Sequence, residues 1–325
     1  MLLSPISAKK YPFYRFWQGS ENRKDTQMDF TQLFCDVDDF CRVFEPFWHQ
    51  RQIASGECHR LRSSALALSE QMTIMIAFHA SNHRDFKHYY LMLMLFHRAD
   101  FPKLVSYSRF VQSMPALLVP LCAYLQTRYG KNTGIAFIDS TALAVCGNKR
   151  IGRNRVFAEY AQRGKTTMGW FFGFKLHLVI NECGELLGAT LTPGNVDDRA
   201  PVPAMTRRII GKLFGDKGYI SAELFQSLWE RGLQLITSIR KNMKNVLIPL
   251  MDKILLRKRS LIETVNDQLK NIAQIEHTRH RSVRNFMVNL VAGLISYSHQ
   301  PKKPALRIPQ NERQTFATLA LPAAT

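Results

Sequence analysis

The feature that most constrains the fold is a change of hydrophobic pattern near Lys131. From about residue 29 up to this point, apolar side chains recur at helical spacing, as in the segment 30–40. Beyond it, short apolar runs of strand length alternate with turns and with segments of helical period. The pattern therefore predicts a helical part followed by a part that contains both strands and helices.

The second part has a definite order of elements, which we read as strand, strand, strand, helix, strand, helix, strand, helix. Asn181–Gly184 reads as a turn, so the second and third strands should form an antiparallel hairpin. The predicted elements are, in chain order, 134–139, 170–180, 185–192, 198–210, 212–216, 220–231, 233–240 and 252–275. An α/β fold follows, a ribonuclease-H-like mixed sheet flanked by helices and preceded by an all-helical N-terminal domain.

We expect four regions along the chain. Residues 1–27 are either an extension upstream of a native start at Met28 or a surface-docked arm. Residues 28–130 form a helical domain whose interleaved basic and aromatic side chains suit DNA binding, the alternative being a packing domain with a solvated basic face. Residues 131–300 form the α/β domain and include a last apolar helix at 286–297, and residues 301–325 form a tail.

The charge balance narrows the class of partner. The chain has 44 Lys plus Arg against 25 Asp plus Glu, a net charge of +19. Such a charge favours a polyanion, with nucleic acid the first candidate and an anionic membrane surface the second. No apolar run is long enough to span a bilayer and no signal peptide is recognisable, so we expect a cytoplasmic protein that is not bound to a membrane.

Three acids fall at related places of this layout. Asp139 ends the first strand, Asp216 ends the fourth, and Glu263 lies on the helix 252–275. The first and fourth strands of such a sheet are neighbours, so these side chains should converge. Three hard oxygen donors suit Mg²⁺, with Mn²⁺ also possible. Two such ions about 4 Å apart would support an in-line phosphoryl transfer.

Each acid also has a plainer interpretation. Asp139 and Asp216 would serve as turn residues, and Glu263 as part of a solvated ion-pair ladder with Arg259 and Lys270 on one helix face. The joint placement of all three acids in one topology favours the catalytic interpretation.

The segment between Cys146 and Gly169 is strongly basic. It should lie beside the acids, because it follows the first strand. We expect it to clamp the DNA backbone, a solvated loop being the alternative. Its basic residues are Lys149, Arg150, Arg153, Arg155, Arg163 and Lys165.

Several motifs, in order from about Met28 to residue 306, resemble the DDE transposases of bacterial insertion sequences, specifically insertion sequence family 982. The matching motifs are Phe-Ile-Asp139-Ser-Thr, Gly-Trp-Phe-Phe-Gly-Phe-Lys175-Leu-His177, Pro-Gly-Asn195-Val-Asp-Asp198-Arg, Gly-Asp216-Lys-Gly-Tyr and Ile-Glu263-Thr. Arg259, Glu263 and Lys270 also match the spacing of a signature in a related branch, although Leu256 stands where that branch has tyrosine.

The resemblance implies a catalytic triad of Asp139, Asp216 and Glu263 that binds Mg²⁺. It implies cleavage at the terminal inverted repeats of an element, then attack of the freed 3′-hydroxyl on target DNA. Arg259 and Lys270 would contact phosphates, and Lys175 joins the expected DNA contacts. Double-stranded DNA is the expected partner, in a homo-oligomer in the bacterial cytoplasm, at the nucleoid. A stand-alone nuclease of the same fold and a catalytically idle repressor of the element are the alternatives.

Overall fold

The computed structural model of the chain describes residues 28–56, 64–81, 83–239, 248–276 and 280–306. Its contacts define two compact units. Among the described residues, the first unit contains those up to Thr127 together with 272–274 and 284–302, and the second contains those of 128–271, 275–283 and 303–306. The predicted extension 1–27 and most of the predicted tail lie outside the described residues.

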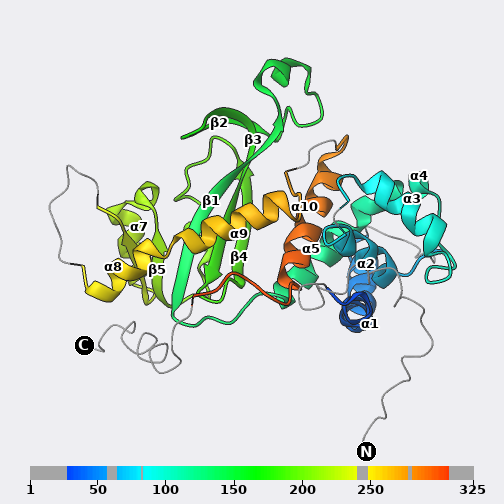
Figure 1. Ribbon diagram of the computed structural model, residues 1–325, viewed down its shortest axis with the longest axis horizontal. Helices are drawn as coiled ribbons and strands as arrows, with labels where there is room; N and C mark the ends of the chain where they lie inside the picture. The colour runs from blue at the N-terminus through cyan, green and yellow to red at the C-terminus, as the bar shows by residue number, and fades with distance from the viewer. Residues whose placement is uncertain (1–27, 57–63, 82, 240–247, 277–279, 307–325) are drawn as a thin grey trace, which may run out of the picture. The chain divides into compact units, whose positions relative to one another are not determined.

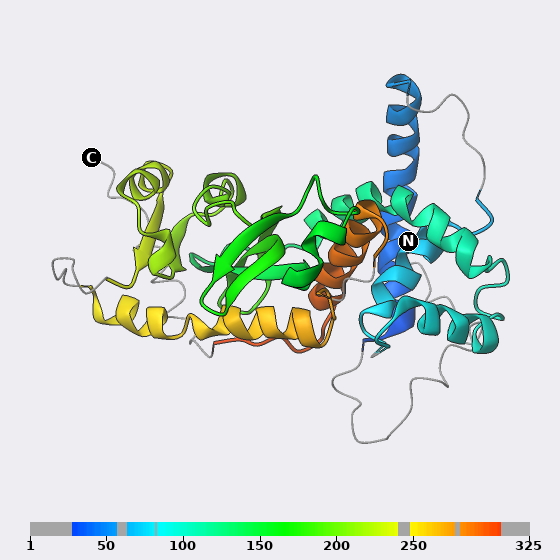
Figure 2. The same ribbon diagram turned by 90° about the horizontal axis from the view of Figure 1, so that it is seen from above.

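The first unit is built of helices. They are α1 (Phe30–Ala54), α2 (Leu68–Phe78), α3 (Phe86–Phe96), α4 (Tyr107–Ser113), the 3-10 helix η3 (Met114–Leu117), α5 (Leu118–Thr127) and all but the start of α10 (Val283–Ser298). The first half of α1 is anchored by the buried Leu33 and Val37, whereas Phe47 in its second half is 64% exposed, and this part of α1 projects in Figure 2. None of the described helices has the length and apolarity that a membrane crossing requires.

The contacts of α10 place it in the helical unit. From the sequence this helix is predicted to belong to the α/β domain, because it follows the other elements of that domain in the chain. From Phe286 to Ser298 nearly every residue of α10 is buried. A helix that is buried on all sides needs neighbours around its whole circumference. The sequence order does not reveal which elements supply those neighbours.

The second unit contains one mixed sheet. Its strands are β1 (Ile135–Cys146), β2 (Gln162–Thr166), β3 (Gly169–Asn181), β4 (Leu186–Pro193), β5 (Gly211–Gly215) and β6 (Leu233–Thr237). The order is β2-β3-β1-β5-β6, and β4 also pairs with β3. The pairs β1–β3 and β3–β4 are antiparallel, and the pairs β1–β5 and β5–β6 are parallel. The predicted ribonuclease-H-like mixed fold is confirmed (Figure 1).

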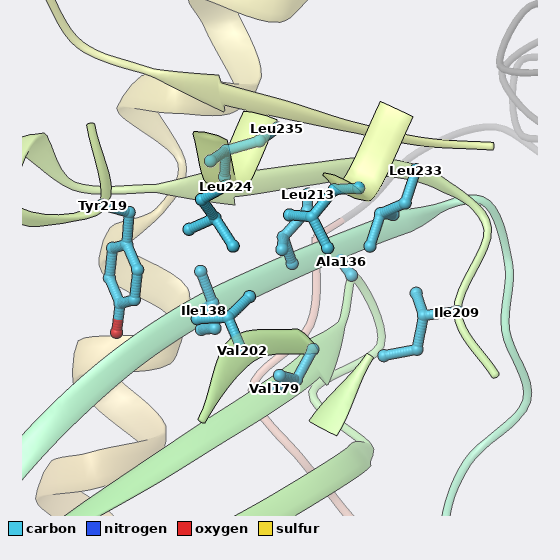
Figure 3. Packing of buried hydrophobic residues seen from close by; sticks show 11 residues of the cluster. Ala136, Ile138, Val179, Val202, Ile209, Leu213, Tyr219, Leu224, Leu233 and Leu235 are labelled. Carbon is cyan, nitrogen blue, oxygen red and sulfur yellow. The ribbon is translucent and has the colours of Figure 1, made fainter. Parts of the chain in front are cut away.

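Helices lie on this sheet because each face carries alternate apolar residues. On one face Ile138, Val179 and Leu213 pack against Val202 of α6 (Val202–Met205) and Leu224 of α7 (Ala222–Trp229), as Figure 3 shows. The other face carries the rings of Phe137 and Phe214, which are tilted relative to each other with their centroids 5.6 Å apart. On this side α8 (Leu250–Arg257) contacts β5 and β6, and α9 (Ser260–Asn271) contacts β1 and β3.

The largest differences between the predicted elements and the structure lie in four segments. The first strand continues past Asp139 to Cys146, and the helix predicted at 198–210 is only the single turn α6. The helix predicted at 252–275 is two helices, α8 and α9. The basic segment predicted as a loop contains the 3-10 helix η4 (Asn148–Arg153) and the strand β2.

Candidate functional site

The sheet register brings Asp139 and Asp216 to the same level. In the parallel pair β1–β5, Ala136 lies opposite Leu213 and Phe137 opposite Phe214. Asp139 lies two residues after Phe137 on β1, and Asp216 lies two residues after Phe214, just beyond the end of β5. Because side chains two residues apart share a face of a strand, Asp139 follows Phe137 on the face that α9 covers. Asp216 directly follows β5 and begins the 3-10 turn η5 (Lys217–Tyr219), where its Oδ1 accepts the Gly218 N–H at 2.8 Å.

Helix α9 supplies the partners of Asp139. The Arg259 guanidinium lies 3.4 Å from Asp139 Oδ1 and 2.5 Å from Glu263 Oε1, so one cation contacts both acids. One turn further along, Asn266 Nδ2 donates to Asp139 Oδ2 at 3.1 Å. Near the end of the helix, Lys270 Nζ donates to the Ala142 carbonyl at 2.6 Å, which ties α9 to β1.

The environment of Asp139 concentrates negative charge. Burial raises the pKa of its carboxyl from the ordinary value near 3.8 to about 6, Arg259 opposes this rise, and the charges of Asp216 and Glu263 add to it. The pKa of one carboxyl thus responds to both other acids, which places all three in one electrostatic neighbourhood. Such a shift on a mostly buried acid is typical of functional sites.

A divalent cation fits this neighbourhood in charge and in donor type. Carboxylate oxygens are the ligands that Mg²⁺ and Mn²⁺ prefer, and a bound cation would offset the burial and the lesser repulsion from Asp216 and Glu263 that raise the Asp139 pKa. Within the described residues, however, no three His, Cys, Asp or Glu side chains are grouped closely enough to hold a metal ion as they stand. Glu263 is 55% exposed and paired with Arg259, so its carboxylate would have to leave this ion pair to bind a metal ion together with the other two acids.

The predicted DNA contacts fall into two groups. One group is exposed and lies on η4, on β2 and between them: Lys149, Arg150, Arg153, Arg155, Arg163 and Lys165. The other group consists of Arg259, Lys270 and Lys175, and each of these cations already has protein partners. Lys270 pairs with Glu276 at 3.3 Å besides its bond to Ala142.

The side chain of Lys175 lies on the other face of the sheet from Asp139. In the β1–β3 register Asp139 is opposite Leu178, and Lys175 is opposite Ala142. Paired residues share a face of the sheet, whereas residues three apart on one strand point to opposite faces, so Lys175 and Asp139 lie on opposite faces. Lys175 Nζ donates to Asp198 Oδ1 at 3.0 Å and to the Val196 carbonyl at 2.9 Å. Its side chain is only 14% exposed, so the prediction that Lys175 contacts DNA has no support in this geometry.

The structure thus combines a ribonuclease-H-like sheet with acids that lie on β1, directly after β5 and on α9. Residues 129–283 match the model of a family described as a transposase DDE domain. The match supports a transposase. No curated protein matches this chain.

Sequence reasoning did not identify Asn266 as part of the site. It is 6% exposed, and its Oδ1 has no hydrogen-bond partner among the described residues. The available signal was its spacing, since a residue three positions after Glu263 lies on nearly the same side of the helix. A buried amide that donates to a carboxylate fixes the orientation of that carboxylate.

We expect Asn266→Ala to lower the rate of DNA cleavage about tenfold or more while leaving DNA affinity unchanged. The loss of a hydrogen bond to the charged form also raises the Asp139 pKa, so the pH at which activity reaches half its maximum should move upward. Asn271→Ala is the matched control, because Asn271 is exposed on the same helix and bonds only Asp267 among the described residues. An equal loss in both variants, or an unchanged pH profile, would contradict a positioning role for Asn266.

The raised Asp139 pKa also predicts a stability effect. A carboxyl whose pKa is higher in the folded state takes up protons on folding, so its contribution to stability increases as the pH falls from about 7 towards 4. In the presence of a chelator at pH 7.5, Asp139→Asn should therefore be more stable than the parent by about 2 kcal/mol. Urea unfolding at pH 7.5 and pH 4.5 measures this difference, which should shrink at the lower pH. A difference that is independent of pH would contradict the assigned cause.

Proposed function

We propose that this protein is the transposase of an insertion sequence. It binds the terminal inverted repeats of its element, cleaves the strands at those ends, and joins the freed 3′-hydroxyls to target DNA. The observation that carries the proposal is the position of Asp139 between the charges of Asp216 and Glu263, with Arg259 in contact with Asp139 and Glu263. These residues lie within a segment that matches a transposase DDE domain. The specific relationship to insertion sequence family 982 is part of the proposal and rests on the motifs of the sequence.

The roles of the site residues follow from their positions. Two divalent cations, either Mg²⁺ or Mn²⁺, would be held by Asp139, Asp216 and Glu263. The bound metal would activate the attacking water or 3′-hydroxyl and stabilise the leaving oxygen. Asn266 holds one oxygen of Asp139 in place, and Arg259 balances the charge of Asp139 and Glu263. With divalent cations bound to the carboxylates, the Arg259 guanidinium would be free to hold a phosphate of the reacting strand.

The exposed cations of the η4–β2 segment are proposed as the contacts to the DNA backbone. Phosphate contacts of this kind position the duplex without reading its sequence. The helical residues 28–130 are proposed as the domain that recognises the terminal repeats. Two ends must be brought together before strand transfer, so the active form is proposed to be a homo-oligomer. The bacterial cytoplasm, at the nucleoid, is the proposed place of action.

An end-cleavage and joining assay tests this proposal. The full chain is incubated with Mg²⁺, DNA that carries the inverted repeats flanking the reading frame, and a supercoiled target plasmid. We expect metal-dependent nicks at the repeat ends and joined products in the plasmid. Cuts without preference for the repeats and without joining would identify a stand-alone nuclease instead. Binding of the repeats with no metal-dependent product would identify an idle repressor.

A further inference from the structure

The hairpin formed by β2 and β3 exposes two large apolar side chains near its turn. Met168 is 95% exposed and Trp170 is 58% exposed. Burying a large apolar side chain stabilises a protein by about 1.5–3 kcal/mol, so side chains of this size are usually covered when the fold permits it. Their joint exposure at the tip of one hairpin suggests a surface that is used in binding.

Local contacts hold the hairpin tip in one conformation. Asn148 Nδ2 donates to the Trp170 carbonyl at 2.8 Å, and Thr166 Oγ1 donates to the Gly169 carbonyl at 3.2 Å. Gly169 has a φ of +117°, a backbone angle that residues other than glycine rarely adopt. Phe171, the next residue of β3, is buried and anchors the hairpin in the sheet. A surface that is already ordered loses little conformational entropy on binding.

The charge around the tip favours a polyanion. The ammonium of Lys165 lies 5.7 Å from the centroid of the Trp170 ring, a cation–π arrangement. From Cys146 to Trp170 the chain has six basic residues, Lys149, Arg150, Arg153, Arg155, Arg163 and Lys165, and one acid, Glu159. The exposed aromatic face therefore lies in a basic segment of the same unit as the acids.

We propose that Trp170, together with Met168 and Lys165, is a stacking contact for an unpaired base of DNA. A duplex exposes its phosphates, which the cations alone can bind, and only the edges of its bases. A flat aromatic ring gains most from the face of a base that has left its stack, and such stacking tolerates every base. Lys165 would hold the phosphate next to that base. The inference rests on the proposed function only in taking DNA as the polyanion.

Fluorescence anisotropy with three labelled duplexes tests this inference on the full-length protein. One duplex is blunt, one has a short single-stranded thymidine overhang, and one has an overhang of the same length made of abasic nucleotides. The abasic overhang keeps every phosphate and removes only the bases. We expect Trp170→Ala to weaken binding of the thymidine overhang about tenfold and to leave the other two duplexes unchanged. Lys165→Ala should weaken binding of all three.

Two variants serve as controls. Trp170→Phe keeps an aromatic face and should retain most of the affinity for the thymidine overhang. Trp229→Ala removes another partly exposed tryptophan, which stacks on Phe225 in α7, and should change nothing. The intrinsic fluorescence of the parent should also be quenched by the thymidine overhang and much less so in Trp170→Ala.

The inference is overturned if Trp170→Ala weakens the thymidine and abasic overhangs equally, or weakens neither. It is also overturned if the variant changes self-association in sedimentation and leaves DNA binding intact, because the tip would then contact a second copy of the chain. Base-dependent binding that persists when the end-cleavage assay fails would leave the stacking inference standing and remove only the proposed function.

Discussion

Replacing any one of Asp139, Asp216 and Glu263 by its amide is expected to reduce strand cleavage at least about 1,000-fold. An amide keeps the size of the side chain but removes the negative charge that a divalent cation requires. Metal-assisted activation of a nucleophile supplies several kcal/mol of transition-state stabilisation, and each 1.36 kcal/mol corresponds to a factor of ten in rate. Single-turnover cleavage of a labelled inverted-repeat duplex in Mg²⁺ measures the effect.

The matched control for Glu263→Gln is Asp267→Asn on the same helix. Asp267 is exposed and accepts a hydrogen bond from Asn271, one turn further along and away from the other acids. The Asp267→Asn variant should retain cleavage and should bind the duplex with the same affinity as the parent. Near-normal cleavage by all three amide variants would remove the site assignment, whereas a loss in only one or two of them would identify which acid has been misplaced.

The convergence of two acids could be anticipated from the sequence because it depends on strand order. Short apolar runs that end near Asp139 and Asp216 place both residues at related points of neighbouring strands. The register between the two strands, which sets the relative position of the two acids along the sheet, could not be anticipated. Asp139 lies inside a strand that continues to Cys146, and only the pairing of Phe137 with Phe214 brings it level with Asp216. Such a register depends on the whole sheet rather than on local pattern.

The break between α8 and α9 could not be predicted from local signals. The segment around Lys258 and Arg259 contains no glycine or proline, and its apolar residues keep a helical period across the break. The break coincides with a long-range contact, since Arg259 immediately precedes α9 and reaches Asp139, 120 residues earlier in the chain. Tertiary contacts of this kind override propensity.

The strand β2 was missed for a different reason. Its five residues, Gln162–Thr166, include no large apolar side chain, so the alternation that identifies a half-buried strand is absent. It is defined by its pairing with β3, in which Lys165 lies opposite Trp170. That pairing places the cation beside the ring, and it could be found only in the structure.

A buried ion pair between β5 and α8 should be the largest single determinant of stability near the site. Lys212 Nζ lies 2.8 Å and 3.0 Å from the two carboxylate oxygens of Asp252, and the two residues are 9% and 2% exposed. Asp252 is in the first turn of α8, where the helix dipole also favours a negative charge. We expect Asp252→Ala to lower the free energy of unfolding by about 3–5 kcal/mol, because it leaves the Lys212 ammonium buried and unpaired.

Urea unfolding of the single variants and of the double variant Lys212→Met/Asp252→Leu separates the cost of an unpaired charge from the worth of the pair. Each single variant should be strongly destabilised, whereas the double variant should lie within about 1–2 kcal/mol of the parent, since apolar side chains of similar volume replace both charges. The pair also fixes α8, which leads directly into Arg259 and Glu263. If it positions the site, the double variant should remain folded yet cleave DNA more slowly, with unchanged DNA affinity. Normal cleavage by a stable double variant would restrict the pair to a structural role, and equal stability of all variants would contradict its burial as a charged pair.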